Sequence, residues 1–385
     1  MRIVYTPDIF SRQSVGGISR YFVELIREFL VAERVDVELS QRWHINEHLR
    51  ELQDTTELPG KFDPRLRVLR HVLPFLNSDF GLRSRTRTNS TAIVHHTYYS
   101  FSSPNGAACL IATAHDVMPE LFWNRSHPRV KGLLLAKRRT LDAANRVIAV
   151  SEHTKRDIVN FYDLDPEVVD VIPHGNRMVS STLDDVRGTS VVQRSKPYLL
   201  YVGARGGYKN WVTLVRAFAE SRFLRREFEI LCFGGGVFSR TEQELLATLG
   251  VSDSVSVTAG DDTALAAAYH GATAFVYPSC YEGFGLPPLE AMGCGCPVIT
   301  SDAASIPEVV GGAGVYFDAT DVDSIRSAIE STVESASKLS RLRQAGLDRE
   351  KQFRWQRTAE LTLLTYEKAL QSDAIAPPSS RRAAA

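Results

Sequence analysis

The sequence predicts an α/β protein built from two doubly wound, Rossmann-like domains. Short β-branched runs alternate with segments of helical periodicity, and this alternation occurs in two separate series. A polar stretch of small residues at 181–195 lies between the series and has the composition of a linker. The length of 385 residues also exceeds the size at which a single hydrophobic core usually stops growing.

The first series predicts a domain over residues 1–180. After the first strand a glycine turn leads into a helix whose residues Ile18, Phe22 and Phe29 share one apolar face. The segment 41–91 keeps no clean period and is expected to form variable helices and loops. Strands are expected at 2–5, 35–39, 92–95, 109–114, 146–150 and 168–172.

The second series predicts a domain over residues 196–354 with a parallel sheet, because its strands are interleaved with helices. The chain is mainly helical after Asp321, and the tail 371–385 contains Pro-Pro-Ser-Ser and is expected to be disordered. Strands are expected at 198–202, 228–233, 255–258, 273–277, 298–300 and 315–317.

Composition excludes several classes of protein. Lys plus Arg and Asp plus Glu both number 45, and this balance argues against a nucleic-acid-binding protein. The five cysteines follow neither a disulfide framework nor zinc spacing, which favours a reducing, cytoplasmic location. The chain opens directly on a strand and contains no apolar run long enough to span a bilayer, so any membrane contact is expected to be peripheral.

The run from Tyr277 to Ala291 has the layout of an anion-binding site. A charge-free strand ends at Tyr277, and Gly283 and Gly285 then allow backbone amides to approach a ligand closely. Pro287 suits the first turn of a helix, whose positive dipole end favours anions. Open α/β sheets bind phosphorylated ligands at this edge, outside the carboxyl ends of their strands.

A second loop supplies positive charge to the same sheet. Arg205 and Lys209 follow the strand at 198–202 in a loop that contains Gly203, Gly206 and Gly207. Arginine can bind phosphate oxygens through two parallel hydrogen bonds, while lysine acts as a point charge. Taken alone, both residues could be solvated loop cations; the glycine-rich segment later in the same sheet favours a role in binding.

These residues resemble a known family. Glu282 and Glu290, which flank Gly283-Phe284-Gly285-Leu286-Pro287, resemble the paired-glutamate signature of the family-four retaining glycosyltransferases. The resemblance keeps the family's order from about residue 1 to 320 and is strongest to bacterial mannosyltransferases of O-antigen and exopolysaccharide assembly. It also covers Gly16-Gly17, His115-Asp116, Ser151-Glu152, Val202-Gly203-Ala204-Arg205, Lys209-Asn210, and Ser301-Asp302 through Pro307-Glu308.

The resemblance implies the GT-B fold, in which two Rossmann-like domains face a cleft and a C-terminal helix, here 355–370, crosses back to the first domain. It implies a retaining, metal-independent hexosyltransferase that needs no cofactor, with GDP-mannose as the best single donor. The acceptor would be a glycan or a lipid-diphosphate-linked saccharide in cell-surface polysaccharide synthesis.

By the same resemblance, Arg205 and Lys209 bind the donor diphosphate and Glu290 accepts hydrogen bonds from the ribose. Glu282 and His115 contact the transferred hexose. The residues that bring backbone close to the donor are Gly16, Gly17, Phe284, Gly285 and Leu286. Structural readings stay open for some of these residues, because Glu290 also suits the helix dipole and a lone histidine such as His115 is often part of a core.

Two other functions share the architecture. A non-hydrolysing nucleotide-sugar 2-epimerase would form product without an acceptor, and a non-catalytic protein would only bind the sugar nucleotide. Metal-dependent transferases use Asp-x-Asp motifs, but Asp163-Leu164-Asp165 and Asp321-Val322-Asp323 are placed as solvated helix-start carboxylates, so no metal site is expected.

One basic stretch is a candidate for contact with anionic lipid. Its charged residues flank Leu133-Leu134-Leu135, a pattern that an amphipathic surface helix can also show when it is merely solvated. The stretch contains Arg125, Arg129, Lys131, Lys137, Arg138 and Arg139, and a second cluster contains Arg83, Arg85 and Arg87.

Overall fold

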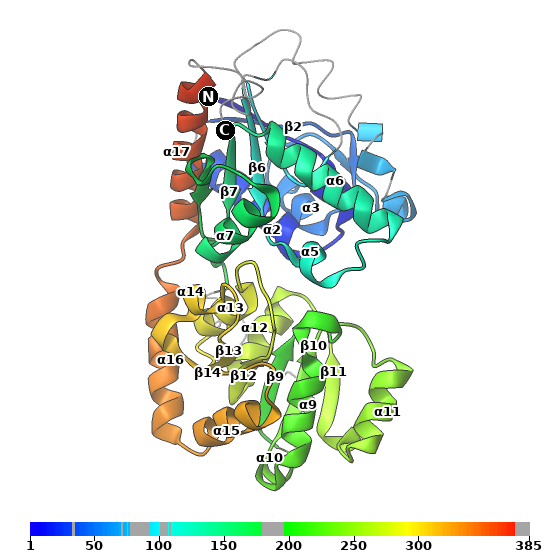
Figure 1. The fold of residues 1–385 in the computed structure, drawn as a ribbon, viewed down its shortest axis with the longest axis vertical. Coiled ribbons are helices and arrows are strands. Elements are labelled where there is room, and N and C mark those ends of the chain that lie inside the picture. Colours follow the sequence, from blue (N-terminus) through cyan, green and yellow to red (C-terminus); the bar gives the residue numbers. More distant parts are fainter. Residues whose placement is uncertain are drawn as a thin grey trace. The chain divides into compact units, whose positions relative to one another are not determined.

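The computed structural model describes residues 1–32, 35–70, 72–74, 76–77, 92–100, 107, 109–178 and 196–373. The chain divides into two compact units, one formed by Met1–Gly175 with Trp355–Ala385 and the other by Asn176–Arg354. Each unit contains a six-stranded sheet covered by helices (Figure 1). The predicted linker at 181–195 and the cluster Arg83, Arg85 and Arg87 lie outside the described residues.

Unit 1 is a parallel sheet with the strand order β2-β1-β5-β6-β7-β8. Its strands lie within one residue of the predicted positions, and a short two-stranded sheet from β3 and β4 is added in the segment that was expected to be irregular. The strands are β1 (Arg2–Tyr5), β2 (Asp36–Leu39), β3 (Trp43–His44), β4 (Lys61–Phe62), β5 (Ile93–His96), β6 (Cys109–Ala114), β7 (Arg146–Ala149) and β8 (Val169–Val171).

The helices of unit 1 follow the strands. Alternate residues of the strands face opposite sides, so that Ile3 and Tyr5 pack in the main core with helix α2 while Val4 faces the other side. The α-helices are α1 (Asp8–Arg12), α2 (Gly17–Ala32), α3 (Glu47–Gln53), α5 (Met118–Phe122), α6 (Pro128–Ala143), α7 (Glu152–Tyr162) and α17 (Trp355–Asp373).

Helix α17 returns the C-terminal segment to unit 1, where it packs against α2, β6 and β7 (Figure 1). The hydroxyl of Tyr366 lies 3.0 Å from the hydroxyl of Tyr5 and 2.7 Å from Nδ1 of His95 in the core. The chain passes Trp355 so closely that a Cβ on Gly175 would lie 2.3 Å from the Trp355 nitrogen, so a glycine is required there. The helix continues to Asp373, so the prediction of a disordered tail from residue 371 is wrong for 371–373, and 374–385 lie outside the described residues.

Unit 2 has the strand order β11-β10-β9-β12-β13-β14, also parallel. Its strands are β9 (Tyr198–Val202), β10 (Glu229–Phe233), β11 (Val255–Thr258), β12 (Ala274–Tyr277), β13 (Val298–Ser301) and β14 (Gly314–Phe317). Its α-helices are α9 (Trp211–Glu220), α10 (Arg222–Glu227), α11 (Arg240–Thr248), α12 (Asp262–Gly271), α13 (Leu286–Gly293), α14 (Ile306–Val310), α15 (Val322–Val333) and α16 (Ala336–Glu350). The predicted doubly wound α/β class is confirmed for both units.

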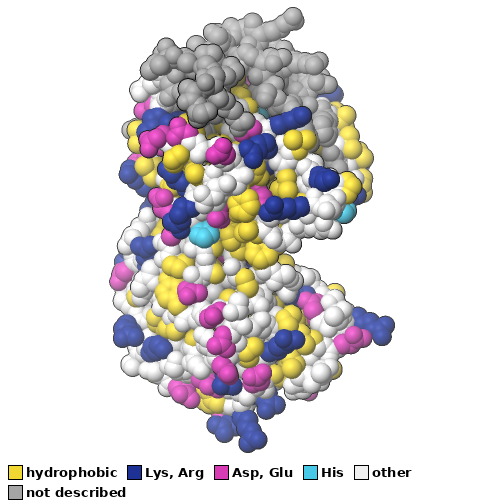
Figure 2. Space-filling view, viewed as in Figure 1, with side chains coloured by type: hydrophobic (Ala, Val, Ile, Leu, Met, Phe, Trp, Pro, Cys, Tyr) yellow, Lys and Arg dark blue, Asp and Glu magenta, His cyan; other side chains and the backbone are white. Residues whose placement is uncertain are grey.

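The surface carries basic and acidic side chains interspersed on the face shown in Figure 2, in keeping with the zero formal net charge. Within the described residues, no helix is both long enough and apolar enough to cross a bilayer.

Candidate functional site

In unit 2 the candidate site lies where the chain order of the sheet reverses. Strands β9 and β12 are neighbours, but the chain leaves β9 toward β10 and β11 before it returns to β12 on the other side. Open α/β sheets bind ligands outside the carboxyl ends of the strands at such a switch point. The predicted site segments follow these two strands directly, because Lys209 comes after β9 and Glu282 comes after β12.

Lys209 and Glu282 meet at this edge. The Nζ of Lys209 lies 2.6 Å from Oε1 of Glu282 and 3.2 Å from the hydroxyl of Tyr277, at the end of β12. The lysine and glutamate side chains are 17% and 13% exposed, so the pair is screened from water but can still be reached by a ligand. The amide of Cys280 donates to the carbonyl of Tyr208 at 2.8 Å, which ties the two loops together.

The start of helix α13 has the geometry that the sequence predicts. Gly285 is the N-cap with a φ of 111°, a left-handed backbone conformation that favours glycine, and Pro287 lies in the first turn. Ser305 lies in the segment after β13. Its hydroxyl lies 2.7 Å from the carbonyl oxygen of Glu282 and 2.8 Å from that of Phe284, so it stabilises the turn before α13. Leu286 is the first helical residue.

Glu290 lies on α13 and is 9% exposed. The hydroxyl of Tyr269, on α12, donates to its Oε2 at 3.3 Å. Burial, and then the negative charge of Glu290, raise the pKa of Tyr269 well above its ordinary value, so this hydroxyl keeps its proton. The carboxylate is therefore oriented by a neutral donor.

Arg205 does not join Lys209 in this structure. Its Nε donates to Oε1 of Glu242 at 2.7 Å, and its side chain is 2% exposed. Its Nη atoms donate to the carbonyl oxygens of a glycine turn, with Nη1 at 3.0 Å from Gly234 O and Nη2 at 2.9 Å from Gly236 O. Nη1 has this one hydrogen-bond partner among the described residues.

The glycine turn explains where the arginine goes. Gly234, Gly235 and Gly236 all have positive φ, and their carbonyl oxygens converge on one guanidinium. Burial opposes ionisation of Glu242, but its hydrogen bonds with Arg205 and Ser239 hold the pKa of the carboxyl below its usual range. The contact of Arg205 with a donor diphosphate stays a prediction.

His115 belongs to unit 1, where it follows β6 as predicted. Its ring contacts those of Tyr21 at 5.2 Å and His174 at 6.0 Å between centroids. Burial first, and then the neighbouring His174, lower the pKa of His115 well below its ordinary value, so the imidazole is neutral. Its buried Nε2 has no hydrogen-bond partner among the described residues, and its contact with a donor sugar stays a prediction.

The segments around these residues also hold capping groups. The Oδ1 of Asp116 accepts from the amide of Met118 at 3.0 Å, and Ser151 caps α7 by accepting from the amide of Thr154 at 3.0 Å, as predicted. Gly16 and Gly17 form the turn into α2, whose first turn is also held by Gln13, because Gln13 Oε1 accepts from the amide of Ser19 at 3.2 Å. Backbone contact of these glycines with a donor stays a prediction.

The sequence did not identify the two tyrosines that orient the site. Tyr277 and Tyr269 lie in apolar stretches of sequence that are typical of a core, and the structure shows both side chains fully buried. The position of Tyr277 as the last residue of a strand was the available signal. His174 was not among the predicted site residues, and the structure places it in the aromatic cluster with Tyr21 and His115.

The described residues contain no group of three or more His, Cys, Asp or Glu side chains arranged to hold a metal ion. The two Asp-x-Asp motifs serve as helix ends: Asp163 is the left-handed C-cap of α7, and Asp321 caps α15 by accepting from the amide of Asp323.

The prediction that the basic stretch forms an exposed surface is wrong for part of it. Lys137 is 0% exposed, and its Nζ lies 2.6 Å from Oε1 of Glu120 and 2.6 Å from the carbonyl oxygen of Asp116. Arg138 donates to the carbonyl oxygen of Tyr162 at 2.7 Å, near the end of α7. The sequence pattern did not indicate that Lys137 is buried. The later turns of α6 lie against α5 and near the end of α7, where Lys137 is paired with Glu120 in the interior.

Comparisons with known proteins identify relatives of this chain. Residues 15–176 match the family model "Glycosyltransferase Family 4" and residues 184–349 match "Glycosyl transferases group 1". The O-antigen chain mannosyltransferase B of Escherichia coli is 27% identical, with 95% of this chain and 100% of the relative covered. An MMP alpha-(1->4)-mannosyltransferase of Mycolicibacterium hassiacum is 30% identical, with 68% and 66% covered.

Solved structures share the fold. Sucrose-phosphate synthase from Thermosynechococcus elongatus has a TM-score of 0.70 at 20% identity, covering 96% of this chain and 99% of its own. Anabaena HepE in complex with UDP has a TM-score of 0.71 at 17% identity, covering 96% and 100%. The chain belongs to the group 1 and family-four glycosyltransferases, with the two α/β units of the GT-B fold.

Proposed function

We propose that this protein is a retaining hexosyltransferase that moves α-mannose from GDP-mannose to a glycan or lipid-linked saccharide during the synthesis of a cell-surface polysaccharide. The observation that carries the proposal is the meeting of Lys209 and Glu282 at the switch point of unit 2, 2.6 Å apart. An ammonium and a carboxylate at this position suit a ligand that has a diphosphate at one end and sugar hydroxyls at the other.

The chemistry assigns a role to each group. When the bond from the sugar carbon to the diphosphate breaks, negative charge grows on the leaving phosphate and positive charge on the sugar ring. Lys209 and the amides at the start of α13 stabilise the leaving phosphate, since preorganised donors act where charge develops. Glu282 accepts hydrogen bonds from the hexose hydroxyls, and Glu290 accepts those of the ribose.

Bond formation then needs only the acceptor hydroxyl. Its oxygen bonds to the anomeric carbon on the face from which the diphosphate leaves, and its proton passes to the departing phosphate oxygen. Configuration is retained without a covalent intermediate, so neither glutamate has to act as a nucleophile. The neutral His115 is suited to hydrogen-bond a hydroxyl of the donor sugar, and Lys209 makes a metal ion unnecessary for the charge of the diphosphate.

The choice of mannose is supported by two relatives whose names specify mannosyl transfer, O-antigen chain mannosyltransferase B and the (1->4)-mannosyltransferase. The structural neighbour with bound UDP shares only the fold at its low identity, so the base of the donor is tested directly. Thermal unfolding in the presence of GDP, UDP and ADP and of their hexose conjugates measures which ligand raises the midpoint, because a ligand of the folded state stabilises it by mass action.

Turnover separates the transferase from the alternatives. We expect saccharide product from GDP-mannose only when an acceptor glycan is supplied. Formation of a 2-epimeric sugar nucleotide without an acceptor would assign the epimerase instead. Binding of the sugar nucleotide with neither product, across a panel of O-antigen-like acceptors, would assign a non-catalytic protein.

We also propose peripheral contact with an anionic membrane, on a surface smaller than the sequence indicated. Leu121, Phe122 and Trp123 are 46%, 46% and 44% exposed at the end of α5, and Lys131 is exposed on the adjacent α6. Exposed aromatic and aliphatic side chains beside a cation suit the boundary between lipid headgroups and acyl chains.

A further inference from the structure

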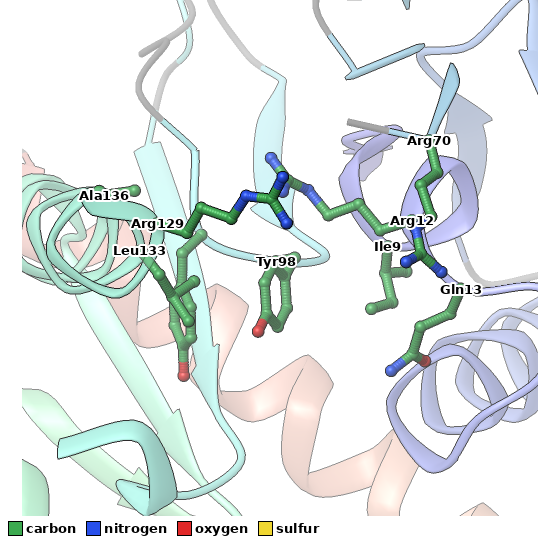
Figure 3. A pocket seen from close by; sticks show the side chains of 10 residues that line it. Ile9, Arg12, Gln13, Arg70, Tyr98, Arg129, Leu133 and Ala136 are labelled. Carbon is green, nitrogen blue, oxygen red and sulfur yellow. The ribbon is translucent and has the colours of Figure 1, made fainter. Parts of the chain in front are cut away.

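Unit 1 contains a pocket at the carboxyl edge of its own sheet (Figure 3). Its volume of about 560 Å³ lies within the range of roughly 300–1,000 Å³ that small-molecule sites occupy. The wall comes from α1, α6 and the loop after β5, with one residue from the segment after η1 (Pro64–Leu69). The residues used below are Ile9, Arg12, Arg70, Tyr98, Arg129 and Leu133.

The topology marks this pocket as a place for a ligand. Strands β1 and β5 are neighbours, yet the chain leaves β1 toward β2 and later returns to β5 on the other side. The switch point of unit 1 therefore lies between these strands. Ile9 and Arg12 follow β1 and Tyr98 follows β5, so both strands that form the switch point contribute to the pocket.

Three arginines from three separate segments line the pocket, and no carboxylate is among its described lining residues. In Figure 3 the side chains of Arg12 and Arg129 extend toward one another from opposite walls, above Tyr98. The Nε of Arg12 is buried and has no hydrogen-bond partner in the described part of the chain. Asp8, on the same helix, is close enough to be influenced by the Arg12 charge, but it does not line the pocket.

Gathering like charges costs free energy that a bound anion would recover. Buried polar groups are usually hydrogen-bonded, so the unpartnered Arg12 Nε indicates a missing acceptor. A carboxylate carries a single charge, whereas a phosphate monoester carries about 1.5 to 2 negative charges and three acceptor oxygens, a better match for three guanidinium groups. Tyr98, Ile9 and Leu133 add apolar surface for the less polar face of a sugar ring.

We propose that this pocket binds a phosphate-bearing group of the acceptor, a glycosyl phosphate or glycosyl diphosphate. Arg12 and Arg129 bind the phosphate oxygens from opposite sides, Arg70 adds a third charge, and Tyr98 supports the adjoining sugar. The acceptor role rests on the function proposed above; the binding of phosphate by these residues does not. The source of the phosphate is either a soluble sugar phosphate or a lipid-linked saccharide.

Binding is measured in a full-length Lys209→Ala background, which weakens phosphate binding at the donor site in unit 2. The soluble probe is mannose 1-phosphate, with methyl α-mannoside as its neutral counterpart, and the lipid probe is a short-chain polyprenyl-diphosphate sugar in detergent micelles. Arg12→Gln, Arg70→Gln and Arg129→Gln are compared with Arg139→Gln, a matched change on α6 outside the pocket. Circular dichroism checks the fold of each variant.

We expect Arg12→Gln and Arg129→Gln each to weaken phosphate binding at least tenfold, Arg70→Gln to weaken it less, and Arg139→Gln to change it less than twofold. Arg12→Lys should restore part of the affinity, since it returns the charge without the second parallel hydrogen bond. Tighter binding of the lipid probe than of mannose 1-phosphate identifies a lipid-linked source, and the reverse identifies a soluble one.

The proposal is overturned if methyl α-mannoside binds as tightly as mannose 1-phosphate, or if folded pocket variants bind both phosphate probes as the background protein does. Release of mannose from GDP-mannose is measured separately with the native protein. Donor turnover without arginine-dependent phosphate binding would refute the phosphate-binding role of this pocket and leave the proposed transferase function in place. Arginine-dependent phosphate binding without any use of sugar nucleotides would refute the proposed transferase function and leave the phosphate-binding role of the pocket in place.

Discussion

Arg205 and Glu242 are joined by a 2.7 Å contact between Nε and Oε1, in which the arginine is almost fully buried. The same guanidinium holds the carbonyl oxygens of the turn at Gly234–Gly236. Because that turn follows β10 at the ligand-binding edge of the sheet, Arg205 fixes the backbone there whatever its contact with phosphate. Lys209, by contrast, is tied to two side chains that a ligand can replace.

We expect Arg205→Ala to lower the stability of unit 2 by about 2–3 kcal/mol, because removal of one partner leaves buried acceptors unsatisfied. The unfolding midpoint in urea, followed by circular dichroism, measures this loss. Arg226→Ala is the control, since Arg226 is an exposed arginine of the same unit. Equal stability of the two variants would show that the turn does not depend on the guanidinium.

We expect Lys209→Ala to keep the fold and to lower turnover by about a hundredfold or more, the scale for loss of one preorganised group that stabilises developing charge. Initial rates with saturating donor report the effect on the chemical step. Lys351→Ala, at an exposed lysine of unit 2, should retain normal rates. A rate for Lys209→Ala close to that of the native protein would place the stabilising charge elsewhere.

Comparison of these two residues shows what the sequence could predict. The alternating runs predicted every strand of the two six-stranded sheets within one residue, since strand spacing depends on local patterns, but not the short strands β3 and β4. The sequence placed Lys209 and Glu282 at the same edge of one sheet, but their direct contact was not predicted, because it depends on β9 and β12 being neighbours. The destination of the Arg205 side chain was not, because it depends on three glycine carbonyls from another loop.

The pocket in unit 1 was missed for a related reason. Arg12, Arg70 and Arg129 are separated by long stretches of sequence and look like ordinary surface cations. Only the strand order, which returns to β5 beside β1, brings their segments together. Lys137 is the opposite case, because its basic neighbours suggested a surface position while the packing of α6 buries it.

We expect unit 1 to lose stability as the pH falls from 7 to 5. Burial lowers the pKa of His95 and His174 to about 3 and that of His96 to about 4, so these rings are neutral when folded. In the unfolded state the pKa of each histidine returns to its ordinary value near 6.5, so below that pH the unfolded state binds more protons than the folded state. Each buried histidine then costs about 2 kcal/mol between pH 6.5 and 5, from the linkage of about 1.4 kcal/mol per pH unit.

Asp8 opposes this trend, because burial raises its pKa to about 6 and the folded state therefore gains a proton as the pH falls through that value. One carboxyl cannot offset several histidines. Urea unfolding at pH 7 and pH 5, monitored by hydrogen exchange in β5 and β6, measures the net change. A constant midpoint over this range would mean that the rings become protonated within the folded unit.

We expect the double variant Trp123→Ala with Lys131→Glu to bind anionic vesicles at least fivefold more weakly, since one cation near such a surface contributes about 1 kcal/mol. Sedimentation with phosphatidylglycerol vesicles measures binding, and donor affinity should not change. Arg156→Glu, at an exposed position on α7, serves as the charge control. An equal loss of vesicle binding in the double variant and in Arg156→Glu would indicate that the vesicles respond to net charge and not to a docking surface.

The last prediction concerns the chemistry of transfer: activity persists in excess EDTA, and the product keeps the α configuration of the donor. A divalent ion in other transferases neutralises the diphosphate, but here the ammonium of Lys209 and the amide-bearing start of α13 lie at the same edge of the sheet. Glu282→Gln should lower the rate without abolishing it, because an amide still accepts hydrogen bonds from the hexose. Loss of activity on chelation that Mn²⁺ or Mg²⁺ restores would require a metal site, and a β-linked product in the NMR spectrum would exclude retention.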